Sequence, residues 1–263
     1  MATLCCFHAH PDDEAIATGG TMRAAADAGH RVILVVATRG EHGEPVPGVL
    51  GPDEQLWERR VRETHAAAEI LGASRVEFLG YVDSGMMGEP TNHADGSFWA
   101  ADVDEAAERL AAILRDESVD VLTVYDEHGG YGHPDHIQVN RVGTRAAELA
   151  GVERVYWATM NRTRILAQMA ENPDMRGEID PDDDPMDMNT FGMPEDDITH
   201  AVDVSAHVAT KRAAMAAHAS QIAPDAFFLA MPDDVFAGAF GTEWFVDPTR
   251  PRAGGAFGAD LFS

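Results

Sequence analysis

Short apolar runs alternate with longer amphipathic stretches along positions 3–159 of the chain. The apolar runs predict buried strands at 3–9, 31–37, 75–79, 119–125 and 154–159. The amphipathic stretches predict helices at 14–28, 54–71, 103–117 and 135–150, with Gly29, Gly72 and Gly151 at the expected helix C-termini. Because strands and helices alternate, the pattern predicts an α/β fold: a doubly wound, mostly parallel sheet with helices on both faces.

The second half of the chain departs from this alternation. Residues 172–197 carry Asp182-Asp183-Asp184 among scattered Pro and Met, which predicts an irregular acidic excursion at the surface. Calcium binding there is the weaker interpretation, because the EF-hand spacing is absent. Residues 198–204 predict a late strand, 206–222 predict a helix, and the aromatic-rich tail 227–245 is expected to cover the crevice. Without an internal repeat or a linker, residues 1–263 are expected to form a single domain.

Composition and charge narrow the class of protein. The chain has 263 residues, of which 45% are hydrophobic, so a globular domain with a sizeable core is expected. A net charge of -26 argues against nucleic acid and anionic membranes as partners. No apolar run reaches the roughly 20 residues of a membrane span, and the N-terminus lacks a basic region before a leader. Cys5 and Cys6 lie side by side in the first predicted strand, which indicates buried free thiols in a reducing cytosol, and we expect a cytoplasmic protein.

Two strand-to-helix corners carry the same unusual chemistry. The sequence HAHPDDE at 8–14 follows the first predicted strand, and DEHGGYGHPDH at 126–136 follows the fourth. Both corners contain His-Pro-Asp followed by another acid or imidazole and then a helical pattern. In an open α/β sheet, ligands bind beyond the carboxyl ends of the strands, so both corners can face one crevice.

The two corners together offer a set of metal ligands. Zinc in hydrolases takes three protein ligands from His, Asp and Glu and keeps one position open for water. His10 and Asp13 from the first corner and His136 from the second would supply two imidazoles and one carboxylate. Asp12 stands beside these residues and is the natural general base, although it could also serve only as a helix N-cap. Iron could occupy the same ligands.

The second corner also supplies candidate proton donors. His133 could stabilise an oxyanion as an imidazolium, and Asp135 could hold the orientation of its ring. Tyr131 is a second possible donor, with simple packing as the alternative. The general alternative is that these groups are solvated polar residues in ordinary loops, and short motifs carry that risk.

The motifs HPDDE at 10–14 and HPDH at 133–136 resemble the two signature motifs of the LmbE/PIG-L zinc-dependent N-deacetylases. The resemblance covers residues 3–160 and implies a Rossmann-like fold that hydrolyses N-acyl groups on glucosamine-type small molecules. It implies one zinc ion per chain on His10, Asp13 and His136, with Asp12 as the base and His133 as an acid or oxyanion donor.

The stretch GGYGHPDH is similar to the mycothiol branch of this family, which contains a deacetylase and an S-conjugate amidase. The likeness implies that Tyr131 is mobile and assists the carbonyl, and that Arg60 and Asp83 bind sugar. Arg60 could instead pair with Glu63 on a solvated helix face, and Asp83 could form only an Asx-turn. The stretches at 218–222 and 242–245 look more like the amidase, whereas Ala17 replaces a lysine of that enzyme.

Two rival hypotheses remain at this stage. A nucleotide-binding oxidoreductase would use the same type of sheet, but it needs Gly-x-Gly-x-x-Gly after the first strand, where this chain has His-Pro-Asp-Asp. A non-catalytic sugar-binding protein on the same fold is the other. An oligomer is compatible with either hypothesis.

Overall fold

The computed structural model describes residues 1–171, 191–252 and 255–263, and their centre is a seven-stranded sheet of order β3-β2-β1-β4-β5-β7-β6. The strands are β1 (Thr3–His8), β2 (Arg31–Val36), β3 (Arg75–Phe78), β4 (Val121–Tyr125), β5 (Arg154–Thr159), β6 (His200–Asp203) and β7 (Thr242–Val246). The first five strands are parallel, whereas β7 runs antiparallel to both of its neighbours. The predicted α/β class and mostly parallel sheet are confirmed.

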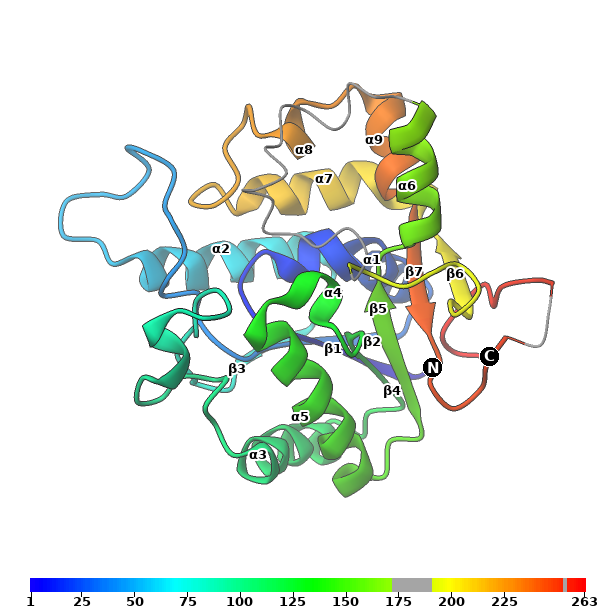
Figure 1. The fold of residues 1–263 in the computed structure, drawn as a ribbon, viewed down its shortest axis with the longest axis horizontal. Helices are drawn as coiled ribbons and strands as arrows, with labels where there is room; N and C mark the ends of the chain where they lie inside the picture. The colour runs from blue at the N-terminus through cyan, green and yellow to red at the C-terminus, as the bar shows by residue number, and fades with distance from the viewer. Residues whose placement is uncertain (172–190, 253–254) are drawn as a thin grey trace.

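Helices cover both faces of the sheet (Figure 1). They are α1 (Gly19–Asp27), α2 (Leu56–Leu71), α3 (Val103–Asp116), α4 (Gly129–Gly132), α5 (Pro134–Ala150), α6 (Arg162–Glu171), α7 (Val208–Ala217), α8 (Phe227–Ala230) and α9 (Asp233–Phe240). One apolar core lies between the sheet and α3 and α5, and a second lies between the sheet and α1, α2 and α7. Among the described helices, none combines the length and apolarity that crossing a membrane requires.

Local sequence signals explain where the helices near the site begin and end. Gln55 and Glu58 form a reciprocal capping box at the start of α2, and Gly72 closes this helix with a φ of 83°. Pro134 is the first residue of α5, where its fixed φ suits a helix start. Within α5, a side chain at Gly143 would collide with Val124 of β4, so glycine allows the helix to lie close against the sheet.

The order of the strands creates a crevice where the two corners meet. From β1 the chain crosses through α1 to β2 on one side, and from β4 it crosses through α5 to β5 on the other. The two helices lie on opposite faces of the sheet, so neighbouring strands β1 and β4 form the topological switch point. The carboxyl ends of these two strands carry the His-Pro-Asp motifs, as the sequence predicted.

Several predicted elements need correction. The tail expected to cover the crevice instead forms α8, α9 and β7, and β7 inserts between β5 and β6 with Phe245 paired to Ala158. Buried and partly buried residues alternate at the start of β7, which is typical of a strand in a sheet. No local signal in the sequence specifies which strands β7 pairs with. The helix predicted at 14–28 begins with a wide turn at Glu14–Thr18 before α1, and the one predicted at 206–222 already ends at Ala217.

Two further differences concern the region after β5. Helix α6 was not predicted from the sequence, and the late strand is the shorter β6. The predicted acidic excursion at 172–197 falls mostly on residues 172–190, which lie outside the described residues, as does the calcium interpretation of Asp182-Asp183-Asp184.

Candidate metal centre and active site

The turn after β1 holds Asp12 in an unusual backbone conformation. Asp12 has a φ of 97°, a region that residues with a side chain rarely adopt. Two hydrogen bonds stabilise the turn: the His10 N–H donates to Asp13 Oδ2 at 2.8 Å, and the Asp12 N–H donates to Glu14 Oε2 at 3.0 Å. Strained backbone of this kind persists only where the surroundings enforce it, and it is common at functional sites.

The glycine-rich loop after β4 is shaped by Asp126. Its buried carboxylate accepts the N–H groups of His128 and Gly130 at 3.0 and 2.9 Å, and the hydroxyl of Thr159 at 2.6 Å. Gly130 has a φ of 76° and marks a kink within α4. The loop therefore delivers His133 to the start of α5, where its Nδ1 caps the helix by accepting the Asp135 N–H at 3.1 Å.

The Asp13 carboxylate stands between His10 of the first corner and His136 of the second. Asp13 Oδ2 lies 3.4 Å from His10 Nδ1 and 3.4 Å from His136 Nε2. His136 Nδ1 lies 3.2 Å from the carbonyl oxygen of Gly129, which can only accept, so Nδ1 carries the proton and Nε2 a lone pair. This buried Nε2 has no hydrogen-bond partner among the described residues.

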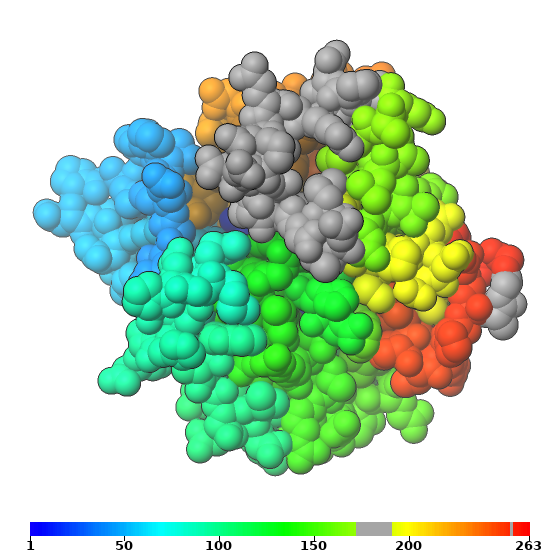
Figure 2. All heavy atoms as spheres, in the orientation of Figure 1, coloured from blue at the N-terminus to red at the C-terminus, as the bar shows by residue number. Residues whose placement is uncertain are grey.

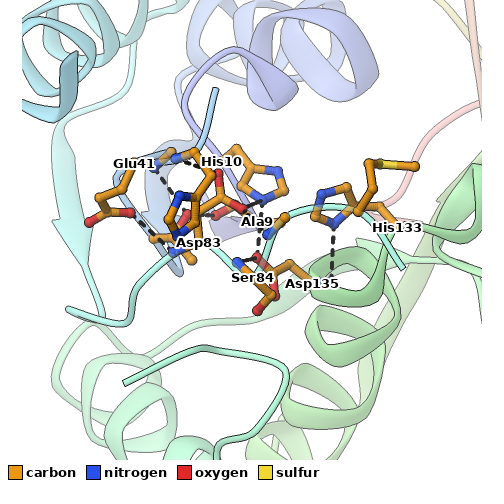
Figure 3. Close-up of polar contacts among 12 residues, drawn as sticks. Ala9, His10, Glu41, Asp83, Ser84, His133 and Asp135 are labelled. Carbon is orange, nitrogen blue, oxygen red and sulfur yellow. Dashed lines mark hydrogen bonds and ion pairs between the residues drawn. The ribbon is translucent and has the colours of Figure 1, made fainter. Parts of the chain in front are cut away.

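The same reasoning applies to His10. Its Nε2 lies 3.2 Å from Asp135 Oδ2 and 3.4 Å from Asp83 Oδ1, so Nε2 carries the proton that faces these carboxylates (Figure 3). Nδ1 of the neutral ring then presents a lone pair toward Asp13. Burial alone would lower the pKa of His10, but the three surrounding carboxylates raise it well above its ordinary value. The carboxylates therefore favour a positive charge beside Nδ1, either a second proton on the ring or a cation bound in place of that proton.

This donor set fits a divalent metal ion. In tetrahedral zinc sites with bonds of about 2.0–2.2 Å, neighbouring ligand atoms are about 3.3–3.6 Å apart, and the two 3.4 Å separations agree with this. Burial alone would raise the pKa of Asp13, but His136 and His10 hold it well below its usual range. The structure thus brings together a group of His and Asp side chains that can hold a metal.

Two other groups around His10 have their ligand atoms close together. Ligand atoms of His10, His133 and His136 lie within 4.8 Å of one another, and so do those of His10, Asp83 and Asp135. In both groups one member is already engaged, because His133 Nδ1 caps α5 and Asp135 accepts from His10. Asp13 belongs to neither of these groups. Its Oδ2 accepts the His10 N–H and lies 3.4 Å from the unpartnered Nε2 of His136, which keeps the set of His10, Asp13 and His136 as the proposed one.

Asp135 plays a different part from the one expected. Its carboxylate accepts from His10 Nε2, from the Ser84 N–H at 2.9 Å and from the Ser84 hydroxyl, and only its backbone N–H contacts His133. The prediction that this carboxylate orients His133 was therefore wrong. It orients His10 instead, as carboxylates that accept a hydrogen bond from a metal-binding histidine commonly do. No local pattern marked Ser84, whose contact with Asp135 depends on the approach of two loops.

Asp12 is held by Arg60. One guanidinium nitrogen of Arg60 lies 2.5 Å from the Pro11 carbonyl oxygen and 3.3 Å from Asp12 Oδ2, and the other donates to the Gly40 carbonyl at 3.0 Å. Burial raises the pKa of Asp12 to about 6, against the lowering effect of Arg60. The alternative pairing of Arg60 with Glu63 is wrong, because Glu63 accepts from Ser220.

The site opens into a cavity of about 270 Å³, near the lower end of the roughly 300–1,000 Å³ typical of small-ligand pockets. Its walls include the predicted residues His10, Asp12, Asp13, Arg60, Asp83, Tyr131 and His133, together with His42, Gly43, Gly85, Met86 and Glu89. The segments around 40–55 and 84–100 project beside each other on this face (Figure 2). The sequence patterns above did not single out His42, although its place after the carboxyl end of β2 is the signal for a lining residue.

Comparison with known proteins identifies the family. The model of PIG-L, described as GlcNAc-PI de-N-acetylase, matches residues 5–147, which is more than half of the chain. The chain belongs to the PIG-L family. This confirms the predicted class of enzyme, an N-deacetylase that hydrolyses an amide bond, and argues against a nucleotide-binding oxidoreductase.

Relatives within the family extend over the whole chain. The 1D-myo-inositol 2-acetamido-2-deoxy-alpha-D-glucopyranoside deacetylase of Acidothermus cellulolyticus is 41% identical over 282 residues, covering 100% of this chain and 95% of that protein. The protein of the same name from Thermomonospora curvata is 39% identical, covering 93% and 90%. The solved structure of N,N'-diacetylchitobiose deacetylase from Pyrococcus horikoshii shares the fold, with a TM-score of 0.60, 21% identity and coverage of 92% and 82%.

In this family member, both candidate donors line the cavity. Burial, reinforced by His10 and His136, lowers the pKa of His133 to about 3, so the expected imidazolium is replaced by a neutral ring. Since its Nδ1 accepts the Asp135 N–H, the proton of the neutral ring lies on Nε2. Burial also raises the pKa of Tyr131, which keeps its phenol protonated and able to donate.

Asp83 forms the Asx-turn considered for it and also lines the cavity. Its Oδ1 accepts the Gly85 N–H at 2.9 Å, which is the Asx-turn, and its Oδ2 accepts the His42 N–H at 3.3 Å. The same side chain faces His10 and lines the cavity. A turn residue can therefore also contact a bound molecule here.

Proposed function

We propose that this PIG-L family member removes the N-acetyl group from a 2-acetamido-2-deoxy-α-D-glucopyranoside attached to an inositol-type alcohol. The observation that carries the proposal is the position of Asp13 Oδ2, 3.4 Å from both His10 Nδ1 and His136 Nε2, beside the half-buried carboxylate of Asp12. The relatives that cover nearly all of the chain are named as deacetylases of such a substrate. They favour a deacetylase over an S-conjugate amidase.

His10, Asp13 and His136 would hold one Zn²⁺ ion, and the same donors would accept Fe²⁺. When bound, the ion supplies a Lewis acid that lowers the pKa of water and polarises the amide carbonyl. Asp135 keeps the His10 ring in the tautomer whose Nδ1 is free to bind the ion. The Gly129 carbonyl accepts from Nδ1 of His136 and so keeps that ring in the tautomer whose Nε2 is free.

The residues around this centre have separate roles in the reaction. Asp12 takes a proton from the attacking water, and the Arg60 guanidinium keeps its carboxylate in place. Tyr131 donates its hydroxyl proton in a hydrogen bond to the carbonyl oxygen as negative charge develops there. His133 Nε2–H lies on the same cavity wall and donates a hydrogen bond to the oxyanion, and the proton that Asp12 took from water passes to the leaving amine.

Arg60 and Asp83 are proposed to bind the sugar. Arg60 lines the cavity, where its guanidinium can donate to a sugar oxygen. Asp83 is 5% exposed and can accept from a sugar hydroxyl at the same cavity. The proposal therefore places the acetamido group near Asp12 and the sugar ring between Arg60 and Asp83.

The test is acetate release by the purified protein from a panel of amides. The panel compares N-acetylglucosaminyl-inositol with free N-acetylglucosamine, diacetylchitobiose and a cysteinyl amide of the S-conjugate type. We expect the inositol glycoside to react fastest, activity to disappear with a chelator, and added Zn²⁺ to restore it. Faster cleavage of the cysteinyl amide would replace deacetylase with amidase. Binding of sugars without any hydrolysis would favour the non-catalytic alternative.

A further inference from the structure

His218 is a buried residue that the proposed reaction does not use. It follows α7 and has 0% exposure, and its Nε2 lies 2.6 Å from Oε1 of Glu14, which is 204 positions away in the sequence. Glu14 is also 0% exposed. The pair therefore joins the C-terminal part of the chain to the motif that contains the proposed base.

The Glu14 carboxylate connects His218 to Asp12. While one carboxylate oxygen of Glu14 contacts His218, the other accepts the Asp12 N–H at 3.0 Å. Asp12 is the residue with the unfavourable φ of 97°, so its backbone needs external support. An N–H bound to a fixed carboxylate can supply that support, because it restrains rotation of the turn about Asp12.

His218 is itself fixed by its neighbours. The next residue but one, Ser220, donates its N–H and its hydroxyl to Glu63 of α2 at 3.0 and 2.6 Å, and its carbonyl accepts the Val46 N–H at 2.8 Å. These contacts anchor the segment 218–221 to α2 and to the loop after β2. The backbone of His218 is therefore held in place, and its imidazole has a fixed position relative to Glu14.

We propose that His218 is a positioning residue for deacetylation: through the Glu14 carboxylate it holds the Asp12 turn in the orientation that the base requires. This inference rests on the proposed function of Asp12. It gives a role to the stretch 218–222, which the sequence alone related only loosely to a subfamily. His218 does not touch the cavity, so its contribution should be seen in turnover and not in substrate binding.

Lys211 provides a matched control, because it lies on α7, the helix that His218 follows. Lys211 of α7 forms a buried ion pair of 2.5 Å with Glu243, whose carboxylate accepts the N–H groups of Gly20 and Thr21 at the start of α1. This pair resembles His218–Glu14 in burial and in linking α7 to the turn region, but it makes no contact with Asp12 in the described structure. Lys211→Met therefore reports what the loss of a buried pair does without the positioning effect.

The experiment compares His218→Ala, His218→Gln and Lys211→Met in the full-length zinc-loaded protein. Because small misplacement of a catalytic group is costly, we expect His218→Ala to lower kcat roughly tenfold or more. KM should stay within about twofold, since ground-state binding is unchanged, and zinc content should stay at one per chain. His218→Gln should recover much of the loss, because its amide can donate to Glu14, and Lys211→Met should retain kcat.

Hydrogen exchange at the Asp12 amide provides a readout that does not depend on activity. We expect faster exchange of this amide in His218→Ala, and wild-type protection in Lys211→Met. If kcat falls equally in both variants, or if Asp12 protection is unchanged in His218→Ala, the positioning role is overturned. If the wild-type protein hydrolyses no amide, the proposed function fails, and exchange alone decides on the link from His218 to Asp12. If His218→Ala does not fold, His218→Phe replaces it in the same comparison.

Discussion

The two faces of the sheet bury different chemistry, although the same strands form both. On the side of α3 and α5 the core is apolar, with Phe7, Phe98 and Leu110 fully buried. On the side of α1, α2 and α7 the apolar core is interrupted by polar pairs. Among the described residues, the two fully buried charge pairs outside the cavity, His218–Glu14 and Lys211–Glu243, both belong to this second side.

This difference indicates a division of tasks. Apolar burial stabilises the fold in proportion to the area removed from water, without fixing any particular hydrogen bond. A buried charge pair adds little net stability, since desolvation offsets the attraction, but removal of one partner leaves a charge unpaired. The α3/α5 face should therefore supply stability, and the α1/α2/α7 face should determine how accurately the Asp12 corner is placed.

The largest expected effect is from His136→Ala, at the point where both faces meet. The variant removes one proposed ligand of the metal, so bound zinc and deacetylase activity should both be lost. Elemental analysis of the purified protein measures the first, and acetate release measures the second. His128→Ala is the control, because His128 stands in the same segment but is 49% exposed. Full zinc content in His136→Ala would refute the ligand assignment.

The second largest effect is expected from Asp12→Asn, which should reduce kcat by roughly 10²–10⁴, the range of general-base catalysis. Asparagine tolerates positive φ, so the turn and the metal content should be retained. Asp53→Asn serves as its control, since Asp53 also has a positive φ, of 64°, but is exposed in a loop. A variant that retains wild-type kcat would exclude Asp12 as the base.

Leu110→Ala tests the apolar face. Leu110 has 0% exposure in the core between the sheet and α3, and such truncations typically cost about 2–5 kcal/mol in the free energy of unfolding. We expect this loss in urea unfolding together with kcat close to wild type in the folded protein. Leu166→Ala on α6, where leucine is 38% exposed, should change stability by much less. A large fall in kcat at unchanged stability would contradict the division of tasks.

The smallest expected effect concerns the thiols of Cys5 and Cys6, which are buried on opposite faces of the sheet. Cys5 belongs to the core on the α3/α5 side, and Cys6 belongs to the core on the α1/α2 side. Burial raises the pKa of both and brings that of Cys6 to about 12. Alkylation of the native protein at pH 8 should therefore run below about 1% of the rate in the denatured protein. Selective labelling of one thiol would show that its face opens more readily.

The local sequence determined a large part of this molecule. Apolar runs and helix caps specified β1 to β5 and the helices between them, because these signals act within a few residues. The two His-Pro-Asp corners also predicted the proposed metal ligands and base as a group, since parallel strands bring their carboxyl ends to one edge. Recognition of the PIG-L family followed from the same motifs and is confirmed by the match to residues 5–147.

Only the tertiary structure decided how these groups support one another. That β7 enters the sheet beside β5, that Asp135 contacts His10 rather than His133, and that His218 reaches Glu14 are all matters of long-range pairing. Each such contact joins residues far apart in the chain, so its free energy depends on the packing of whole elements and not on neighbouring residues. Sequence patterns therefore specify the chemical groups of the site, whereas the packing of the elements determines which of these groups form hydrogen bonds with one another.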